Sequence, residues 1–320
     1  MSFAALALCA TLTTLAACAH TRPPVNALAT RQQADGARAY AAGDLVTAEA
    51  RFQLALEYEP NMAQALAGLG LVARQRGDRD AARRWLNAAV KANAELAEAH
   101  AALGVLDLEE GQPERAMTRF RAALDVDPGF AAARHDLARA LAQRGRVPEA
   151  IAELRKLLAV RADAAAWGEL ADLERRLGHT TFCDAAIAHA LALDPHATVA
   201  LRVRAARLRD QGRATDALAT LDDAIALAPA DPLLRLDRGV LYVLVGRTRD
   251  AIVDLRRAVA LAPALPAAHF ALGAALIETG DDTAALPLLA DAARLARAQG
   301  GRHAEAETLA AQARTRLGTH

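Results

Sequence analysis

Serine and aromatic side chains are scarce in this sequence of 320 residues. The only serine is Ser2, and aromatic residues make up 3% of the chain. Without its N-terminus the chain therefore has no serine nucleophile and no serine ligand for a magnesium-bound phosphate. The sequence also has no His-Glu-x-x-His motif, no Cys-x-x-Cys pair and no phosphate-binding loop. We therefore expect a protein that is not an enzyme and that uses no metal or cofactor.

Net charge is also missing, because 38 basic residues balance 38 acidic residues. Nucleic acid binding requires a basic face that neutralises phosphates, so we expect no nucleic acid partner. Apolar residues are plentiful, at 53% of the total, and many of them are alanine. This composition favours closely packed helices and excludes disorder over most of the chain.

The N-terminus has the pattern of an export signal. Residues 3–17 form an uncharged apolar run that is too short to span a bilayer comfortably. The run closes with Leu-Ala-Ala-Cys at residues 15–18, which resembles the lipobox of bacterial lipoproteins. The resemblance implies cleavage before Cys18, attachment of a diacylglycerol to its thiol and acylation of its new amino group. No Lys or Arg precedes the run, which departs from the family pattern, and an ordinary cleaved signal peptide is the alternative.

Under the lipoprotein interpretation, residues 1–17 are the signal peptide and residues 18–28 form an extended, lipidated tether. Ala19, rather than Asp, follows the lipid cysteine, and in the family this implies the outer membrane rather than retention at the inner one. We therefore expect an outer membrane lipoprotein of the bacterial envelope that faces the periplasm and contacts the membrane through its lipid only. Cys183 would have no partner for an internal disulfide.

Eight glycines recur along the rest of the chain at intervals of 34 residues, with one interval of 33. They are Gly43, Gly77, Gly111, Gly145, Gly178, Gly212, Gly246 and Gly280. A small residue stands five positions after each glycine, and a large apolar residue stands nine positions after it. Proline closes several of the units. Apolar residues three to four positions apart predict two amphipathic helices per unit, with a turn at the glycine and a stop at the proline.

This pattern resembles the tetratricopeptide repeat family. The resemblance covers eight repeats, at residues 29–62, 63–96, 97–130, 131–163, 164–197, 198–231, 232–265 and 266–299. It implies an all-α fold in which helix-turn-helix repeats stack into a right-handed superhelical solenoid. We expect residues 300–320 to form a capping helix and tail, with Leu309, Ala310, Ala313 and Leu317 on its apolar side.

The first helix of each unit is expected to line an inner surface, where related proteins take up peptides or partner helices. In repeats four to six this helix offers charged residues: His135, Asp136, Arg139, Glu169, Asp172, Arg175, Arg176, Arg202, Arg209 and Asp210. In repeats seven and eight it offers apolar residues: Leu233, Leu236, Val240, Val243, Leu244, Phe270 and Ile277. A polar middle and an apolar end predict a site for an amphipathic helix or extended peptide whose apolar anchor lies near the C-terminal repeats. The alternatives are that the apolar residues are covered as core and that the charged residues form only a solvated face.

Some relatives clamp the C-terminal carboxylate of chaperones with lysines and asparagines in their first helices. That subclass is disfavoured here, because Gln33, Ala37 and other non-matching residues stand at the corresponding places. Gly68 and Gly70 superficially match a dinucleotide fingerprint, but no strand precedes them and Gly70 falls in a repeat column. We therefore expect this glycine pair to be structural.

Arg204 and Arg238 stand in a column that other repeats fill with leucine. Because a buried charge needs a partner, we expect an ion pair between Arg204 and Glu174, and another between Arg238 and Asp237. The alternative is that both arginines extend to solvent on their apolar stems.

The sequence favours a non-catalytic protein-interaction scaffold, similar to tetratricopeptide lipoproteins that help to assemble pili or secretion pores. Its expected partners are proteins or peptides of the cell envelope, and self-association through the last repeats stays open. The competing hypothesis is a soluble periplasmic or secreted adaptor for peptides or cell-wall enzymes. From repeat one to repeat eight the formal charges are −2, +3, −4, +3, −3, 0, +3 and −2, so we expect electrostatics to favour the correct stacking order.

Overall fold

The computed structural model describes residues 26–298, 301 and 303–318. All regular secondary structure in this part of the chain is helical, as expected for an all-α protein. The first compact unit, Met1–Glu110, holds α1 (Ala27–Ala41), α2 (Leu45–Tyr58), α3 (Ala63–Gln75), α4 (Arg79–Ala92) and α5 (Ala97–Glu109). The second unit, Gly111–His320, holds α6 (Pro113–Val126), α7 (Ala131–Gln143), α8 (Val147–Leu158), α9 (Ala164–Arg176), α10 (Thr180–Leu193), α11 (Thr198–Asp210), α12 (Ala214–Leu227), α13 (Pro232–Leu244), α14 (Thr248–Leu261), α15 (Pro266–Glu278), α16 (Asp282–Ala298) and α17 (Ala304–Leu317).

A glycine turn joins the two helices of each repeat. The eight periodic glycines all have φ between 71° and 84°, a left-handed conformation that other L residues adopt only at a cost of about 1–2 kcal/mol. Asp44, Asp78 and Asp281 directly follow three of these glycines, and each side chain accepts a hydrogen bond from the backbone N–H three residues later. The glycine turn therefore ends the first helix, as predicted, and in these three repeats the following aspartate caps the second helix.

Small residues in fixed columns let the paired helices approach closely. Ala48 and Ala82, each five residues after a turn glycine, are completely buried. A Cβ on Gly68 would lie 2.4 Å from Cζ of Phe52, and one on Gly70 would lie 2.6 Å from Cγ of Leu86. Both glycines lie inside α3, so they make room for core side chains and form no nucleotide-binding turn.

The last helix covers the end of the second unit. Helix α17 packs against α16 and α15 and buries Ala306, Ala310 and Ala313. Leu309 is partly buried against the same core, whereas Leu317, at the last position of the helix, is 40% exposed and is not covered by this core. Helix α17 ends at Leu317, directly before a glycine in the left-handed conformation.

The N-terminal boundary differs from the sequence-based expectation by two residues. The side chain of Asn26 caps α1 by accepting a hydrogen bond from the N–H of Leu28, and the helix begins at Ala27. The last two residues assigned to the tether are therefore helical. Cys18 and the apolar run before it lie outside the described residues. None of the helices in the described part of the chain combines the length and the hydrophobicity needed to cross a membrane.

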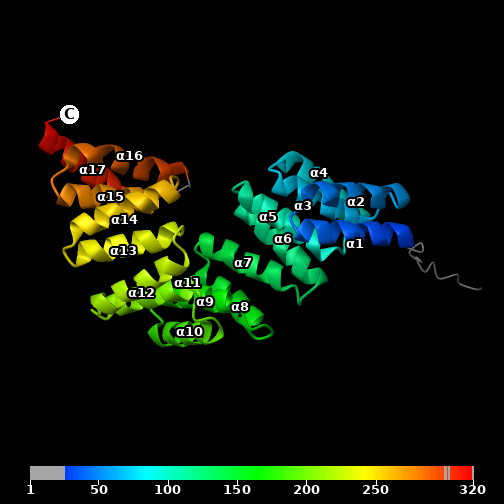
Figure 1. The fold of residues 1–320 in the computed structure, drawn as a ribbon, viewed down its shortest axis with the longest axis horizontal. Coiled ribbons are helices and arrows are strands. Elements are labelled where there is room, and N and C mark those ends of the chain that lie inside the picture. Colours follow the sequence, from blue (N-terminus) through cyan, green and yellow to red (C-terminus); the bar gives the residue numbers. More distant parts are fainter. Residues whose placement is uncertain (1–25, 299–300, 302, 319–320) are drawn as a thin grey trace, which may run out of the picture. The chain divides into compact units, whose positions relative to one another are not determined.

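Within the second unit, the odd-numbered helices α9, α11, α13 and α15 contact one another in sequence. Figure 1 shows α13, α14, α15 and α16 stacked in chain order, with α17 beside α15 and α16. This arrangement places the first helices of neighbouring repeats side by side, so that their exposed residues form one surface. We refer to it as the inner surface of the second unit.

Candidate functional site

Three hollows lie along the inner surface of the second unit. The first, the middle groove, has a volume of about 400 Å³ and is lined by Ala138, Arg139, Ala142, Gln143, Leu154, Glu169, Asp172, Leu173, Arg176, Val199, Arg202 and Leu233. The second, the arginine pocket, has about 70 Å³ and is lined by Asp172, Arg175, Arg202, Val203, Ala205, Ala206, Arg209, Leu221, Asp237 and Leu241. The third, the apolar groove, has about 410 Å³ and is lined by Leu236, Asp237, Val240, Val243, Leu255, Ala267, Phe270, Ala271, Ala274, Ala275 and Glu278. The arginine pocket shares Asp172 and Arg202 with the middle groove and Asp237 with the apolar groove, so it adjoins both.

The apolar groove opens because large side chains on α13 face small ones on α15. Val240 and Val243 belong to α13, whereas Ala271 and Ala274 stand on the facing surface of α15. Alanines there cannot fill the space between the helices, and Val240 remains 38% exposed. The result is an open, apolar hollow of the kind that takes up a partner's side chains.

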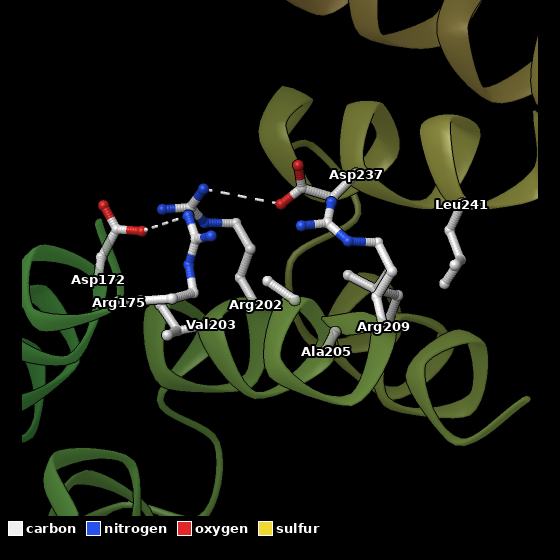
Figure 2. Close-up of a pocket in the computed structure, with 10 residues that line it drawn as sticks. Asp172, Arg175, Arg202, Val203, Ala205, Arg209, Asp237 and Leu241 are labelled. Atoms are coloured by element: carbon white, nitrogen blue, oxygen red, sulfur yellow. Dashed lines mark hydrogen bonds and ion pairs between the residues drawn. The ribbon is translucent and has the colours of Figure 1, made fainter. Parts of the chain in front are cut away.

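The arginine pocket gathers charges from α9, α11 and α13. Figure 2 shows Arg175, Arg202 and Arg209 turned toward one space between Asp172 and Asp237. Arg175 Nη2 lies 3.4 Å from Asp172 Oδ1, and Arg202 Nη1 lies 3.6 Å from Asp237 Oδ2. Both distances exceed the 2.7–2.9 Å of a strong charge-assisted hydrogen bond. The pocket thus holds three guanidinium groups that its own carboxylates satisfy only loosely.

Burial and charge act against each other at Asp237. Burial raises the pKa of its carboxyl group, and this effect outweighs the lowering effect of Arg202, Arg209 and Arg175. The Asp237 side chain is still 37% exposed and so only half-buried, but a carboxylate that loses part of its water is destabilised even beside cations when no short hydrogen bond compensates. Asp237 is therefore a weakly held anion at the point where the arginine pocket meets the apolar groove.

His135 and Cys183, both in the second unit, have surroundings that fit a role in stabilising the fold. Glu169 raises the pKa of His135 through a hydrogen bond of 2.9 Å, although burial acts in the opposite direction. Cys183 is buried in the column that other repeats fill with alanine, and burial raises the pKa of its thiol to about 11. A thiol of this kind is a poor nucleophile at neutral pH.

The family is shown by matches to two sequence models, both described as tetratricopeptide repeat. One model matches residues 107–173, and the other matches residues 34–100 and 236–299. Together these segments cover more than half of the chain. The chain is a tetratricopeptide repeat protein. Neither matched family model describes a catalytic domain. No curated protein matches the sequence significantly.

Solved structures with the same fold include the APC/C hetero-tetramer Cut9–Hcn1 (TM-score 0.63, 18% identity), yeast Tom70 (0.60, 17%) and the human IFIT1 dimer with m7Gppp-AAAA (0.58, 18%). The alignments cover 84%, 93% and 85% of this tetratricopeptide repeat protein. They cover 52%, 66% and 69% of the respective matched chains, so this chain spans only about half of the matched Cut9–Hcn1 chain. At such low identity the comparison establishes only the helical solenoid fold. The ligand of this protein has to be inferred from its own residues.

The residues predicted for the binding surface of the tetratricopeptide repeats are distributed over the three hollows. The apolar groove contains Leu236, Val240, Val243 and Phe270. The middle groove contains Arg139, Arg176, Arg202 and Leu233, and the arginine pocket contains Arg175, Arg202 and Arg209. Five of the predicted residues line none of these hollows: His135, Asp136, Asp210, Leu244 and Ile277. The structure therefore brings together most, but not all, of the predicted groove residues.

Coverage of the apolar residues is partial. Leu236 is only 8% exposed and belongs to the core, and Phe270 is partly buried with its ring 4.4 Å from that of His303. Leu244, by contrast, is 65% exposed at the end of α13. The alternative that these apolar residues are covered as core therefore holds for Leu236 at the base of the groove. Val240 is exposed and accessible to a partner.

Both predicted ion pairs were wrong. Glu174 is buried and pairs with Arg155 at 2.7 Å and with His179 at 2.8 Å, whereas Arg204 is exposed and has no ion pair among the described residues. Arg204 is therefore solvent-exposed, as the alternative interpretation predicted.

Arg238 does not pair with its neighbour Asp237. It bonds to Asp254 at 2.6 and 2.8 Å and to Asp222 at 2.6 Å. Successive residues of a helix point in directions about 100° apart, so Asp237 faces the inner surface while Arg238 faces the outer helices α12 and α14.

Other residues with functional chemistry have local roles. His100 and His269 stand in the same column, and each ring bonds through Nε2 to the backbone carbonyl six residues earlier, at 3.0 and 2.9 Å. Asp282 is buried at the start of α16 and lies 3.3 Å from Arg316 of α17. Over the described ranges, no three His, Cys, Asp or Glu side chains gather in a group that could hold a metal ion.

Ala271 and Ala274 had no predicted role in the site, and Asp237 was expected only as a partner for Arg238. A signal was present for Ala274, because it stands at the repeat position that Val240 occupies on α13, whereas Ala271 stands at the position of Asp237. Small residues opposite large ones on neighbouring helices indicate a hollow between them.

Proposed function

We propose that this tetratricopeptide repeat protein is a non-catalytic scaffold of the bacterial envelope that binds a partner protein through the inner surface of repeats five to eight. The apolar groove between α13 and α15 is the observation that carries the proposal. Its lining is mainly apolar, Val240 is open to solvent, and the arginine pocket adjoins it at Asp237. Such a surface suits a segment with apolar side chains at one end and polar ones at the other.

The envelope location rests on the N-terminal sequence. The Leu-Ala-Ala-Cys motif supports attachment of a lipid to Cys18, and the absence of aspartate at the next position supports the outer membrane. In this proposal the lipid is the only membrane contact, and the repeats face the periplasm, where they support assembly of a multiprotein machine such as a pilus or a secretion system. The alternative is a soluble periplasmic or secreted adaptor, favoured by the missing positive charge before the apolar run.

Partner binding is tested by placing a photo-crosslinking amino acid at Val240 and, as a matched control, at Val253. Val253 is also exposed, at 68%, but belongs to the outer helix α14. We expect a defined adduct from Val240 only, and loss of partner binding in Val240→Glu but not in Val253→Glu. Equal adducts from both positions, or none from either, would contradict the proposed surface. An adduct with the mass of a second copy would identify self-association as the use of this groove.

The anchor is tested separately by metabolic labelling with a palmitate analogue. We expect label on the wild-type chain and none on Cys18→Ala, with both proteins showing the same thermal melting curve. Equal label on both variants would defeat the proposed attachment site. An unlabelled but shortened wild-type chain would favour the soluble adaptor.

A further inference from the structure

We infer that a hollow formed by α8, α9 and α10 is a second docking site, and that it takes up a proline-rich extended segment of a partner protein. This hollow, the aromatic hollow, has a volume of about 410 Å³, within the range of about 300–1,000 Å³ that is usual for ligand sites. It shares no lining residue with the three hollows of the inner surface. The inference therefore goes beyond the proposed inner binding surface and does not depend on it.

Three rings line this hollow in a chain that has few aromatic residues. Trp167 of α9 stacks on His189 of α10, with ring centroids 4.5 Å apart and an angle of 23° between the ring planes. Phe182 stands nearer the start of α10 and is 60% exposed. None of the other seven repeats has Phe, Tyr or Trp at the position of Trp167 or of Phe182. Stacking of the repeats thus does not require these rings, and an exposed phenylalanine beside a stacked pair indicates a surface for a ligand.

The hollow is open where α8 ends early. Helix α8 has 12 residues, whereas the second helices α2, α4, α6, α10, α12 and α14 each have 14. Two residues correspond to about half a helical turn. The small residue Ala159, directly after the last residue of α8, lines the hollow. The early end and the small side chain therefore leave Trp167 only partly buried.

The side chains of the hollow have unused hydrogen-bond donors but no unused carboxylate. Glu174 is the only acidic residue of the lining and is 1% exposed. One of its oxygens accepts a bond from Arg155 Nη2 at 2.7 Å, and the other bonds to Nδ1 of His179 at 2.8 Å. The indole N–H of Trp167 and the other N–H groups of Arg155 donate to no group in the part of the chain that the structure describes. Donors thus remain for a ligand that brings acceptors.

Charge and hydrogen bonding together favour a neutral ligand. A cation would approach Arg155, whose guanidinium carbon already lies 5.5 Å from the centre of the Phe182 ring. An anion would approach the buried Glu174, whose charge Arg155 already balances. Sugar hydroxyl groups donate as well as accept, and the lining has no free carboxylate or amide side chain to accept from them. A ligand with apolar surface, acceptors and few donors therefore fits the hollow best.

A proline-rich segment has this chemistry. Proline has no N–H group, so consecutive prolines offer carbonyl acceptors without backbone donors. They also favour the extended polyproline II conformation, which is formed before binding and so loses little entropy. Aromatic-lined grooves are a general means of holding such segments. In the aromatic hollow, Trp167 and Phe182 would pack against proline rings, and the indole N–H of Trp167 would donate to a carbonyl of the segment.

The test uses the full-length chain and a phage-displayed library of ten-residue peptides with the fixed core Pro-Pro-x-Pro and random flanks. Phage that bind Phe182→Ala are removed before selection on the wild type, and a matched library carries the core Ala-Ala-x-Ala. Selected peptides are titrated against protein labelled with ¹⁵N in tryptophan, and the indole N–H signals are followed by NMR. The chain has two tryptophans, so Trp85 of α4 is an internal reference and Trp85→Phe assigns the two signals.

We expect a selected proline peptide to shift the Trp167 signal downfield, because its N–H gains an acceptor, and to leave the Trp85 signal in place. Fluorescence anisotropy should show binding to Phe182→Ala weakened about tenfold or more, as is typical for loss of a buried ring. Trp167→Phe keeps an aromatic ring but removes the donor, and it should weaken binding about three- to tenfold. Val253→Ala shortens a side chain of similar exposure, 68%, on α14 and should bind like the wild type.

Two kinds of result would overturn the inference. If the proline library yields no peptide that shifts the Trp167 signal, although circular dichroism and thermal melting show folded protein, the docking site falls. Equal enrichment from the alanine library would overturn the choice of a proline-rich ligand. A shift of the Trp167 signal with an N-acetylglucosamine tetrasaccharide but with no proline peptide would do the same and would identify a sugar site. None of these results involves Val240 or the apolar groove, so the proposed function would stand.

Discussion

Asp254 is expected to contribute far more to stability than Asp222, although the same arginine binds both carboxylates at the same distance. Arg238 lies 2.6 Å from an oxygen of each. The Asp254 side chain is 3% exposed and also accepts a bond from Arg235 at 3.0 Å, whereas the Asp222 side chain is 55% exposed. Solvent screens the second pair but not the first, so burial and not distance decides the magnitude.

The magnitudes follow from that difference. Asp254→Ala leaves a buried guanidinium without its main partner, which typically costs about 3–5 kcal/mol. Asp222→Ala removes an exposed pair, worth about 0–1 kcal/mol. Urea unfolding of both variants, followed by circular dichroism, should therefore show a large shift of the midpoint for Asp254→Ala and a small one for Asp222→Ala, with unchanged slopes. Equal shifts would refute the argument from burial.

A double substitution provides the control for the buried pair. Repeat eight has Leu272 and Leu288 at the positions of Arg238 and Asp254. Arg238→Leu combined with Asp254→Leu thus copies an apolar solution that the same fold already uses. Because a buried ion pair contributes little net stability over well-packed apolar residues, the double variant should recover most of the loss seen in Asp254→Ala. A double variant as unstable as Asp254→Ala would show that the lost stability comes from more than an unpaired charge.

Three further predictions concern packing, pH and thiol reactivity. Gly68→Ala places a Cβ 2.4 Å from the Phe52 ring and should lower the free energy of unfolding by about 1–3 kcal/mol in urea; no measurable loss would show that the ring moves freely. The pKa of His135 is raised by Glu169, so the stabilisation is complete below the unfolded pKa of about 6.5 and is lost as the pH rises through the folded pKa. His135→Gln should therefore cost more stability at pH 5.5 than at pH 8.5, and an equal cost at both would contradict this linkage. Cys183, with a pKa of about 11 and a buried thiol, should react with iodoacetamide at pH 8 only after unfolding in urea, as mass spectrometry would detect; rapid reaction of the native protein would contradict its burial.

The fold was predictable because the sequence within each repeat determines the structure of that repeat. A turn glycine, a small residue five positions later and a large apolar residue nine positions later define one helical pair, and the structure places Gly77, Ala82 and Leu86 as this pattern requires. No long-range information is needed for these elements, since the partners lie within one repeat or the next.

The ion pairs and the groove were less predictable, because they depend on the reach and direction of single side chains. The repeat position of Arg238 identifies the helix face on which it lies. It does not reveal that Arg238 forms hydrogen bonds with Asp254 of the following helix. The hollow above Leu236 likewise depends on the alanines of α15 and not on the apolar residues of α13 alone. The repeat positions in the sequence therefore predicted which surface is apolar. The side chains of the facing helix α15 determine where that surface is open.

A neutral total charge also conceals where charge is left over. Ion pairs connect neighbouring repeats in both units, for example Arg76 with Glu49 at 2.6 Å and Arg144 with Glu114 at 3.0 Å, in keeping with the alternating charges of the repeats. Arginines engaged in this way are neutralised by their neighbours and offer little to a partner. In the pocket of Arg175 and Arg202 the distances are longer, at 3.4 and 3.6 Å, whereas Arg209 is paired with Asp210 at 2.9 Å. A total of zero thus conceals a local difference in how tightly the arginines are paired, and the loosest pairs lie where the charged surface meets the apolar groove.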